Sequence, residues 1–110
     1  MGLRSEVLGR TATLFVDGEI DMSSAAGLSA ALDAVLVVRP SMLCIDLSGV
    51  TFCDSTGFRV LVKTAVRAGE QGCAVVTRGV TAGVMRVVEI LGVQAVLGIV
   101  ASPPGEGDVR

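Results

Sequence analysis

Apolar residues come in short runs that are typical of β-strands. Two such runs stand near the N-terminus, and the second ends at Asp17-Gly18, a pair that favours a turn. The run Met42–Leu47 is almost continuously apolar, as expected of a strand that is buried on both faces of a sheet. The pattern predicts five strands, at Ser5–Leu8, Ala12–Val16, Met42–Leu47, Cys73–Thr77 and Ala95–Val100.

Between these runs, apolar residues recur at helical spacing and predict three helices. The first follows Ser23 or Ser24, either of which can cap it, and ends before Pro40. The second extends from Gly57 to Ala68, and the third begins after the capping residue Thr81. The side chains expected to face the core are Leu28, Leu32, Val35, Phe58, Leu61, Val62, Ala65, Val84, Val87, Val88 and Leu91.

The element order β-β-α-β-α-β-α-β predicts a layered α/β domain. Strands joined through helices are expected to pair in parallel at the centre of the sheet, with the first strand antiparallel to its neighbour. A chain of 110 residues is expected to fold as one domain, here residues 1–101. Residues 102–110, with two prolines and two glycines, are expected to form a frayed tail.

The composition narrows the class of protein. Apolar residues make up 51% of the chain and charged residues 18%, which excludes a disordered protein. No run reaches the roughly 20 apolar residues of a membrane span, and no secretory signal opens the chain, so a cytoplasmic protein is expected. The net charge of −2 and the three aromatic residues argue against nucleic-acid binding. The four scattered methionines are expected to fill gaps in the core.

Few reactive side chains are available for catalysis. The chain has no histidine, which removes Ser-His and Cys-His pairs, the usual imidazole base and most metal sites. The three cysteines, Cys44, Cys53 and Cys73, form no CxxC pair and are expected to be buried free thiols. No enzyme activity, cofactor or metal is therefore expected.

The run Val50–Gly57 lies between a predicted strand and a predicted helix, where open α/β sheets place their sites. A phosphate on Ser55 would lie at the positive end of the helix dipole, which favours anions. Asp54 or Ser55 can equally be a plain helix cap, which stabilises a helix by about 1 kcal/mol. Spacing alone leaves both interpretations open.

A family resemblance separates these interpretations. The run LCIDLSGVTFCDSTGF (Leu43–Phe58) resembles the signature of the STAS family, the anti-sigma-factor antagonists. Val16–Asp21 is similar to the family's second strand and following turn, and Gly92-Val93 to its turn after the third helix. The likeness covers about residues 10 to 100. It implies the STAS fold, an α/β fold with a four- to five-stranded mixed sheet and helices packed on it.

The resemblance also implies a regulatory cycle. The unphosphorylated protein would bind an anti-sigma factor, a serine kinase with a histidine-kinase-like ATPase fold, and so release the sigma factor. The kinase would phosphorylate Ser55 and the complex would dissociate. A PP2C-type serine phosphatase would then reset the switch. Phosphorylation adds about −1.5 to −2 charges beside Asp54 and near Asp21, so repulsion would act against the docked complex.

The resemblance assigns further residues to partner binding. Arg59, Lys63 and Arg67 recur every four residues on the second helix. Like charges at this spacing mildly destabilise a helix, and a row of them suits an acidic partner, although a solvated face would look the same. The whole expected partner surface is Asp21, Asp54, Ser55, Thr56, Gly57, Arg59, Lys63 and Arg67.

Two other functions compete with this prediction. Cys53 and Arg59 form a C-x5-R pattern, the layout of cysteine-dependent phosphatases, but Asp54 would put a carboxylate inside the anion cradle. STAS domains also serve in transporter regulation and in stress-signalling complexes. Members of the family usually end in a further amphipathic helix, which residues 102–110 cannot supply. Either the tail is truncated or that face is covered by self-association, as in a homodimer.

Overall fold

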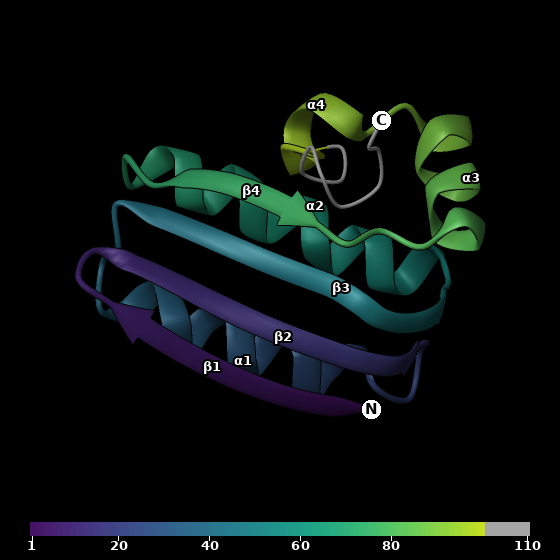
Figure 1. Ribbon diagram of the computed structural model, residues 1–110, viewed down its shortest axis with the longest axis horizontal. Coiled ribbons are helices and arrows are strands. Elements are labelled where there is room, and N and C mark those ends of the chain that lie inside the picture. The colour runs from purple at the N-terminus through teal and green to yellow at the C-terminus, as the bar shows by residue number, and fades with distance from the viewer. Residues whose placement is uncertain (101–110) are drawn as a thin grey trace, which may run out of the picture.

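The computed structural model describes residues 1–100. Its four strands lie in the order β1-β2-β3-β4, so chain order and spatial order agree (Figure 1). β1 is antiparallel to β2, and β2, β3 and β4 are parallel to one another, as predicted. The bounds are Gly2–Leu8 for β1, Thr11–Ile20 for β2, Met42–Cys53 for β3 and Ala74–Arg78 for β4. The predicted tail at 102–110 falls outside the described residues.

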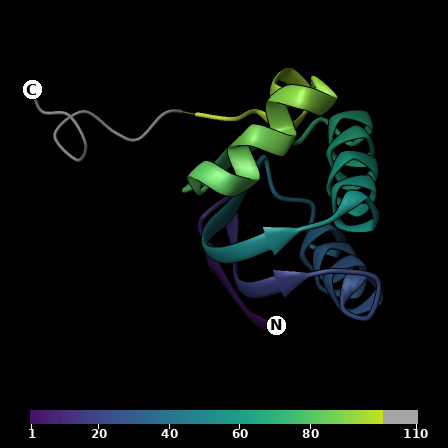
Figure 2. The ribbon, with the colours of Figure 1, turned by 90° about the vertical axis from the view of Figure 1, so that its right-hand side faces the viewer.

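Two long helices cover one face of this sheet. α1 (Ala25–Val37) and α2 (Ser55–Glu70) lie side by side on it, and Figure 2 shows both on the same side of the strands. α3 (Ala82–Leu91) packs against β3, and α4 (Gln94–Leu97) packs against α2 and β4. The opposite face of β1, β2 and β3 stays open in Figure 1. The two faces of the sheet therefore differ: helices cover one, and the other is open.

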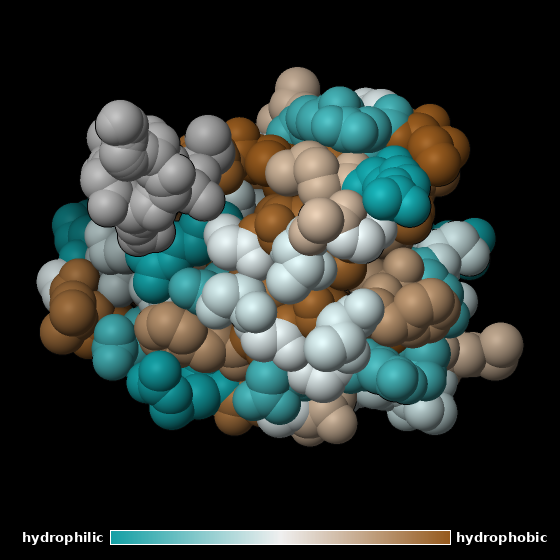
Figure 3. All heavy atoms as spheres, turned by 45° about the vertical axis from the view of Figure 1, so that its right-hand side comes forward, coloured by the Kyte–Doolittle hydropathy of each residue, from teal (hydrophilic) through white to brown (hydrophobic). Residues whose placement is uncertain are grey.

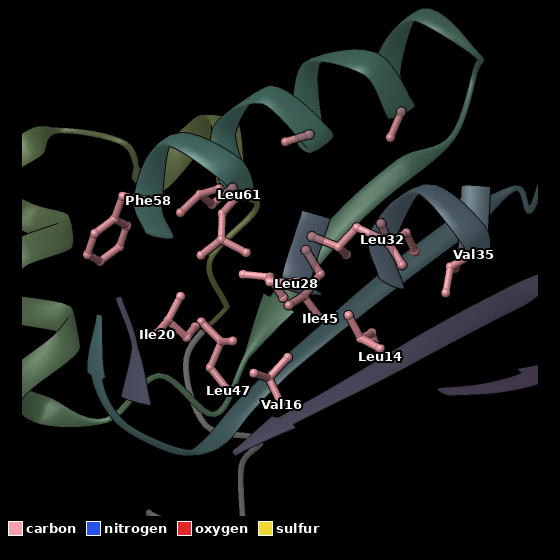
Figure 4. Packing of buried hydrophobic residues seen from close by; sticks show 14 of the residues in the cluster. Leu14, Val16, Ile20, Leu28, Leu32, Val35, Ile45, Leu47, Phe58 and Leu61 are labelled. Carbon is pink, nitrogen blue, oxygen red and sulfur yellow. The ribbon is translucent and has the colours of Figure 1, made fainter. Parts of the chain in front are cut away.

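The core lies between the sheet and the two long helices (Figure 4). Leu14 from β2 and Ile45 from β3 meet Leu32 from α1 there, and α2 adds Leu61. All four side chains are at most 1% exposed. Of the side chains predicted to face the core, Leu91 is the error, because it is 47% exposed at the end of α3. The others are buried or packed against the core cluster; Val84 and Val88 of α3, for example, are 2% and 1% exposed.

β2 and β3 are both longer than predicted. Asp17-Gly18 is not a turn but part of β2, where the register with β3 shifts on either side of the pair. Gly18 has a φ of 92° there, a conformation that glycine adopts readily at a β-bulge. β2 therefore continues to Ile20 and β3 to Cys53. The two extended strands carry the candidate site to the end of the sheet.

The predicted strand Ala95–Val100 is wrong. Its first half is the short helix α4, which ends at Gly98 with a φ of 62°. Only Ile99 makes a bridge, in parallel with Thr77, and no fifth strand forms within residues 1–100. An apolar run of this length does not distinguish strand from helix by its pattern alone.

The three cysteines are buried and free, as predicted. The prediction that the methionines fill the core is wrong at three of the four, because Met1, Met22 and Met42 are 43%, 77% and 37% exposed. Met85 packs against the core cluster as predicted. Within the described part of the chain, none of the helices has the length and apolar character needed to cross a membrane.

Candidate functional site

The junction between β3 and α2 is built around Asp54. Its backbone is extended, and its side-chain Oδ1 accepts the backbone N–H of Gly57 at 3.0 Å. Its own backbone N–H donates to the carbonyl oxygen of Ile20 at 3.0 Å. Asp54 is thus the N-cap of α2 and also ties the start of this helix to the end of β2.

Ser55 is the first residue of α2, and its side chain is exposed. Because Asp54 performs the capping, the Ser55 hydroxyl has no hydrogen-bond partner among residues 1–100. The first N–H groups of a helix have no partner within the helix. An anion bound covalently to Ser55 would therefore lie beside unpaired N–H groups and the positive end of the helix dipole. Thr56, by contrast, is half-buried.

Asp21 begins the neighbouring loop, directly after β2. Since Ile20 pairs with Cys53 across the sheet, Asp21 and Asp54 leave adjacent strands at the same end. The Asp21 carboxylate accepts the Ser23 hydroxyl at 2.7 Å and the Ser23 backbone N–H at 2.9 Å. These bonds, the hydroxyl first, hold the pKa of Asp21 below its ordinary value despite some desolvation. The site is therefore bordered by fixed negative charge.

Gly57 lets the first turn of α2 lie directly on the ends of β2 and β3. It is buried, and a Cβ at this position would come within 2.5 Å of Ile20 Cγ2 and 2.8 Å of Cys53 Sγ. Any side chain would push the helix start away from the sheet. Gly57 therefore fixes the position of Ser55 by letting the helix start pack closely on the sheet. Because it is buried, it offers little surface to a partner.

The three cations of α2 do not share one environment. Arg59 and Lys63 are exposed, about 6 and 12 Å along the helix axis from Ser55 at 1.5 Å per residue. Arg67 is about 18 Å away by the same rise and forms an ion pair with Asp33 of α1 at 2.7 Å. The structure thus brings Arg59 close to the junction and holds Arg67 against the other helix.

The Cys53 thiol is unsuited to nucleophilic chemistry. Burial, followed by the negative charge of Asp54, raises the pKa of Cys53 to about 12. The side chain is 4% exposed. A thiol in this setting stays protonated at neutral pH, and a protonated thiol is a poor nucleophile. This geometry argues directly against the C-x5-R phosphatase.

Two apolar residues beside the acidic loops were not among the predicted site residues. Met22, which follows Asp21, is 77% exposed, and Phe52, two residues before Asp54, is 50% exposed. Large apolar side chains that stay exposed beside a polar site are candidates for partner contact. Their only signal in the sequence is their place next to the two aspartates. The sequence predicts a core position for Met22 and no role for Phe52.

Known proteins resemble this chain in sequence and in fold. The family model described as "Mlab, STAS domain" matches residues 4–100. "Anti-sigma-F factor antagonist RsfB" of Mycobacterium tuberculosis is 41% identical over 69 residues, which is 62% of this chain and 57% of that protein. "Anti-sigma-B factor antagonist" of Listeria monocytogenes is 33% identical over 86 residues, covering 78% and 75% of the two chains.

Among solved structures, an anti-sigma factor antagonist from Mycobacterium paratuberculosis superposes with a TM-score of 0.78 at 30% identity, over 92% of this chain and 86% of that one. The mycobacterial relative RsfB is matched over little more than half of its length, 57%. The family model, in contrast, spans nearly all of the described residues, including both acidic loops and α2. This chain belongs to the STAS-domain family.

Proposed function

We propose that this STAS domain is an anti-sigma factor antagonist, and that phosphorylation of Ser55 switches off its binding to the anti-sigma factor. The names of the mycobacterial and listerial relatives support the first part. The second part rests on one observation, the exposed and unengaged Ser55 hydroxyl at a helix start that Asp54 already caps. The circuit would operate in the cytoplasm, where RNA polymerase works.

The partner in this proposal is a serine kinase with a histidine-kinase-like ATPase fold. The Ser55 oxygen attacks the γ-phosphorus of ATP, its proton passes to a base of the kinase, and ADP leaves. A PP2C-type phosphatase later hydrolyses the ester. The chain's own chemistry is then limited to accepting and losing a phosphoryl group, which agrees with the protonated state of Cys53.

Charge explains why the modified form should leave its partner. The new phosphate would join the Asp54 and Asp21 carboxylates at one end of the sheet. Docking would bury three neighbouring negative groups, and both repulsion and desolvation oppose that. Arg59 is four residues after Ser55 and so on the same side of α2. A phosphate there would attract Arg59 and compete with the partner for it.

The unmodified surface suits a transient complex. We assign partner contact to Ser55, Thr56, the exposed cations Arg59 and Lys63, and the apolar side chains Met22 and Phe52. On the face shown in Figure 3, hydrophobic residues are scattered among polar ones rather than gathered in one broad patch. Interfaces that form and dissociate have such mixed composition. Arg67 would add only general charge, since Asp33 already pairs with it.

The test uses purified protein, its cognate anti-sigma factor kinase and ATP. Mass spectrometry should place the phosphate on Ser55. In binding measurements by calorimetry, Ser55→Ala should bind as tightly as the unmodified protein, with or without ATP. Ser55→Asp should bind at least about tenfold more weakly, a loss of about 1.4 kcal/mol of binding free energy.

Thr56→Ala is the matched control, because it removes the neighbouring hydroxyl and should leave phosphorylation and release intact. Phosphate on Thr56 instead of Ser55 would overturn the choice of acceptor. Equal binding by Ser55→Ala, Ser55→Asp and the phosphorylated protein would overturn the switch.

A further inference from the structure

β1 forms an outer edge of the sheet, with β2 as its neighbour on one side and, within residues 1–100, no strand on the other (Figure 1). Its residues from Leu3 to Leu8 are exposed. A free edge offers unpaired N–H and C=O groups to any further strand, and proteins commonly guard it with proline, lysine or a bulge. β1 contains no proline or lysine, and its seven-residue register with β2 is uninterrupted.

An apolar groove runs beside this edge, between β1 and α1. Leu3 and Val7 border it from the strand, and Ala34 of α1 and Val38, the C-cap of that helix, border it from the other side. Leu3 is 38% exposed, Val7 52% and Val38 59%. The edge thus combines free backbone groups with an apolar flank on the side of the sheet that carries the helices.

The opposite face of β1 carries one pair of charges. Arg4 and Glu6 lie 3.5 Å apart as an ion pair, and the Arg4 guanidinium lies 4.1 Å from the centre of the Phe15 ring. Their side chains are 64% and 47% exposed. An ion pair this exposed contributes little to stability, so both charges are available to a partner strand.

We propose that β1 pairs antiparallel with β1 of a second copy of this chain, about a two-fold axis at Ser5. In this register Arg4 of each copy faces Glu6 of the other, Leu3 faces Val7, and Ser5 faces Ser5. Residues directly opposite in an antiparallel pair point to the same face. The charged pairs therefore meet on the open face, and the apolar pairs meet beside the two grooves.

The charge pattern selects this register. A two-fold axis perpendicular to the sheet requires each residue to face one of the same parity, so the nearest alternatives are centred on Arg4 or on Glu6. The first would place Arg4 against Arg4, and the second Glu6 against Glu6. Like charges directly opposite one another destabilise strand pairing. Only the register centred on Ser5 gives opposite charges on both sides of the axis.

Pairing of this kind is compatible with the proposed switch. Ser55 follows β3, two strands in from the edge, or about 10 Å across the sheet. The axis keeps both sets of helices on one side, so the apolar groove of each copy meets Leu3 and Val7 of the other. The result is a continuous eight-stranded sheet with two separate Ser55 sites.

Sedimentation velocity tests the proposal with matched charge reversals. Wild-type protein should shift from monomer to dimer as its concentration rises to about 1 mM, since an interface of one strand and a helix flank is small. Arg4→Glu and Glu6→Arg each replace two opposite-charge contacts by two like-charge contacts. Each should raise the dissociation constant at least about tenfold.

Mixing the two variants in equal amounts should restore the dimer, because every charge in the mixed pair again faces its opposite. Arg86→Glu, an exposed reversal on α3, should behave as wild type. A wild-type protein that stays monomeric throughout overturns the proposal, as does a mixture no more dimeric than its components. Circular dichroism confirms that each variant is folded.

A cross-link gives a second readout that does not depend on charge. All three native cysteines are buried, so Ser5→Cys introduces an accessible thiol at the proposed axis. It should form a disulfide-linked dimer under mild oxidation, and Glu89→Cys on α3 should form little. Equal cross-linking of the two variants would contradict pairing about Ser5.

Discussion

Two strand-to-helix junctions lie side by side in this fold and use their hydroxyl groups differently. β3 leads into α2 through Asp54, whose carboxylate caps the helix and leaves Ser55 free. β4 leads into α3 through Thr81, which is the N-cap residue but makes no capping hydrogen bond. Its hydroxyl donates instead to the carbonyl oxygen of Val50 at 3.1 Å. One hydroxyl is available to a partner, and the other holds α3 against β3.

The junction between β2 and α1 extends the comparison. The Ser24 hydroxyl accepts the backbone N–H of Asp21 at 2.9 Å and lies within hydrogen-bond distance of the carbonyl oxygens of Glu19, in β2, and Asp21, in the loop. Of the three junctions, only the one before α2 assigns the cap to a carboxylate and places the serine one residue later. The proposed switch therefore depends on the pair Asp54-Ser55, and not merely on a serine at a helix start.

The largest effect should come from filling the space under the switch. Gly57→Ala places a Cβ against Ile20 and Cys53, and overpacking of this kind costs about 2–3 kcal/mol of the free energy of unfolding. Chemical denaturation measures the loss. Phosphorylation should also slow, because the start of α2 must move away from β2 and so displaces Ser55.

Gly69→Ala is the matched control at the other end of the same helix, where no atom lies within 4 Å of the added Cβ. It should stabilise the protein by about 0.5–1 kcal/mol, since alanine favours helix more than glycine does. A loss at Gly69 as large as that at Gly57 would show that α2 tolerates no change anywhere, and the packing argument would fail.

The next effect separates capping from charge. Asp54→Ala should lower the free energy of unfolding by about 1 kcal/mol, whereas Asp54→Asn should lower it much less, because asparagine caps as well as aspartate. The asparagine variant removes one negative charge beside Ser55 without losing the cap. Once phosphorylated, it should keep more affinity for the anti-sigma factor than the phosphorylated wild type. Equal loss of affinity would remove Asp54 from the repulsion argument.

Much of this arrangement could be predicted from the chain. The parallel centre, the antiparallel first strand and most of the core follow from apolar periodicity, and the family motif marked Asp54 and Ser55. The motif could not show which of the two caps the helix, since both residue types are good caps. That choice depends on the N–H of Gly57 and the carbonyl of Ile20, which come together only in the folded chain.

Two of the errors lie where the conformation of a glycine overrides a local pattern. Asp17-Gly18 has the composition of a turn, but pairing with β3 absorbs it as a bulge. Residues 95–100 have the composition of a strand, yet the left-handed Gly98 follows α4 and leaves only Ile99 to pair with Thr77. In both places glycine decides the outcome by a conformation that hydropathy does not report.

A smaller effect is expected at the second junction. Thr81→Ala removes the hydrogen bond to Val50 and should cost about 0.5–1 kcal/mol. Thr81→Ser keeps the hydroxyl and should recover most of that loss. Neither change should alter phosphorylation of Ser55, which kinase assays would measure. If Thr81→Ala slowed phosphorylation as strongly as Gly57→Ala, the two junctions would act as one unit rather than as a switch and an anchor.

The smallest effect is a shift in titration at Asp21. The Ser23 hydroxyl is the main cause of its lowered pKa, so Ser23→Ala should raise the pKa of Asp21 toward its ordinary value of 3.8. A carboxyl whose pKa is lowered in the folded state stabilises the fold at pH values above its ordinary pKa. That contribution disappears as the pH falls through the folded-state pKa. The variant should therefore lose a small part of its stability near neutral pH and become less sensitive to acid below about pH 4.

NMR titration of the Asp21 carboxyl measures the shift in its pKa directly. Ser24→Ala is the control, because the Ser24 hydroxyl contributes least to the lowered pKa. If Ser23→Ala left the pKa unchanged, the negative border of the Ser55 site would depend on the backbone of this loop rather than on its hydroxyls.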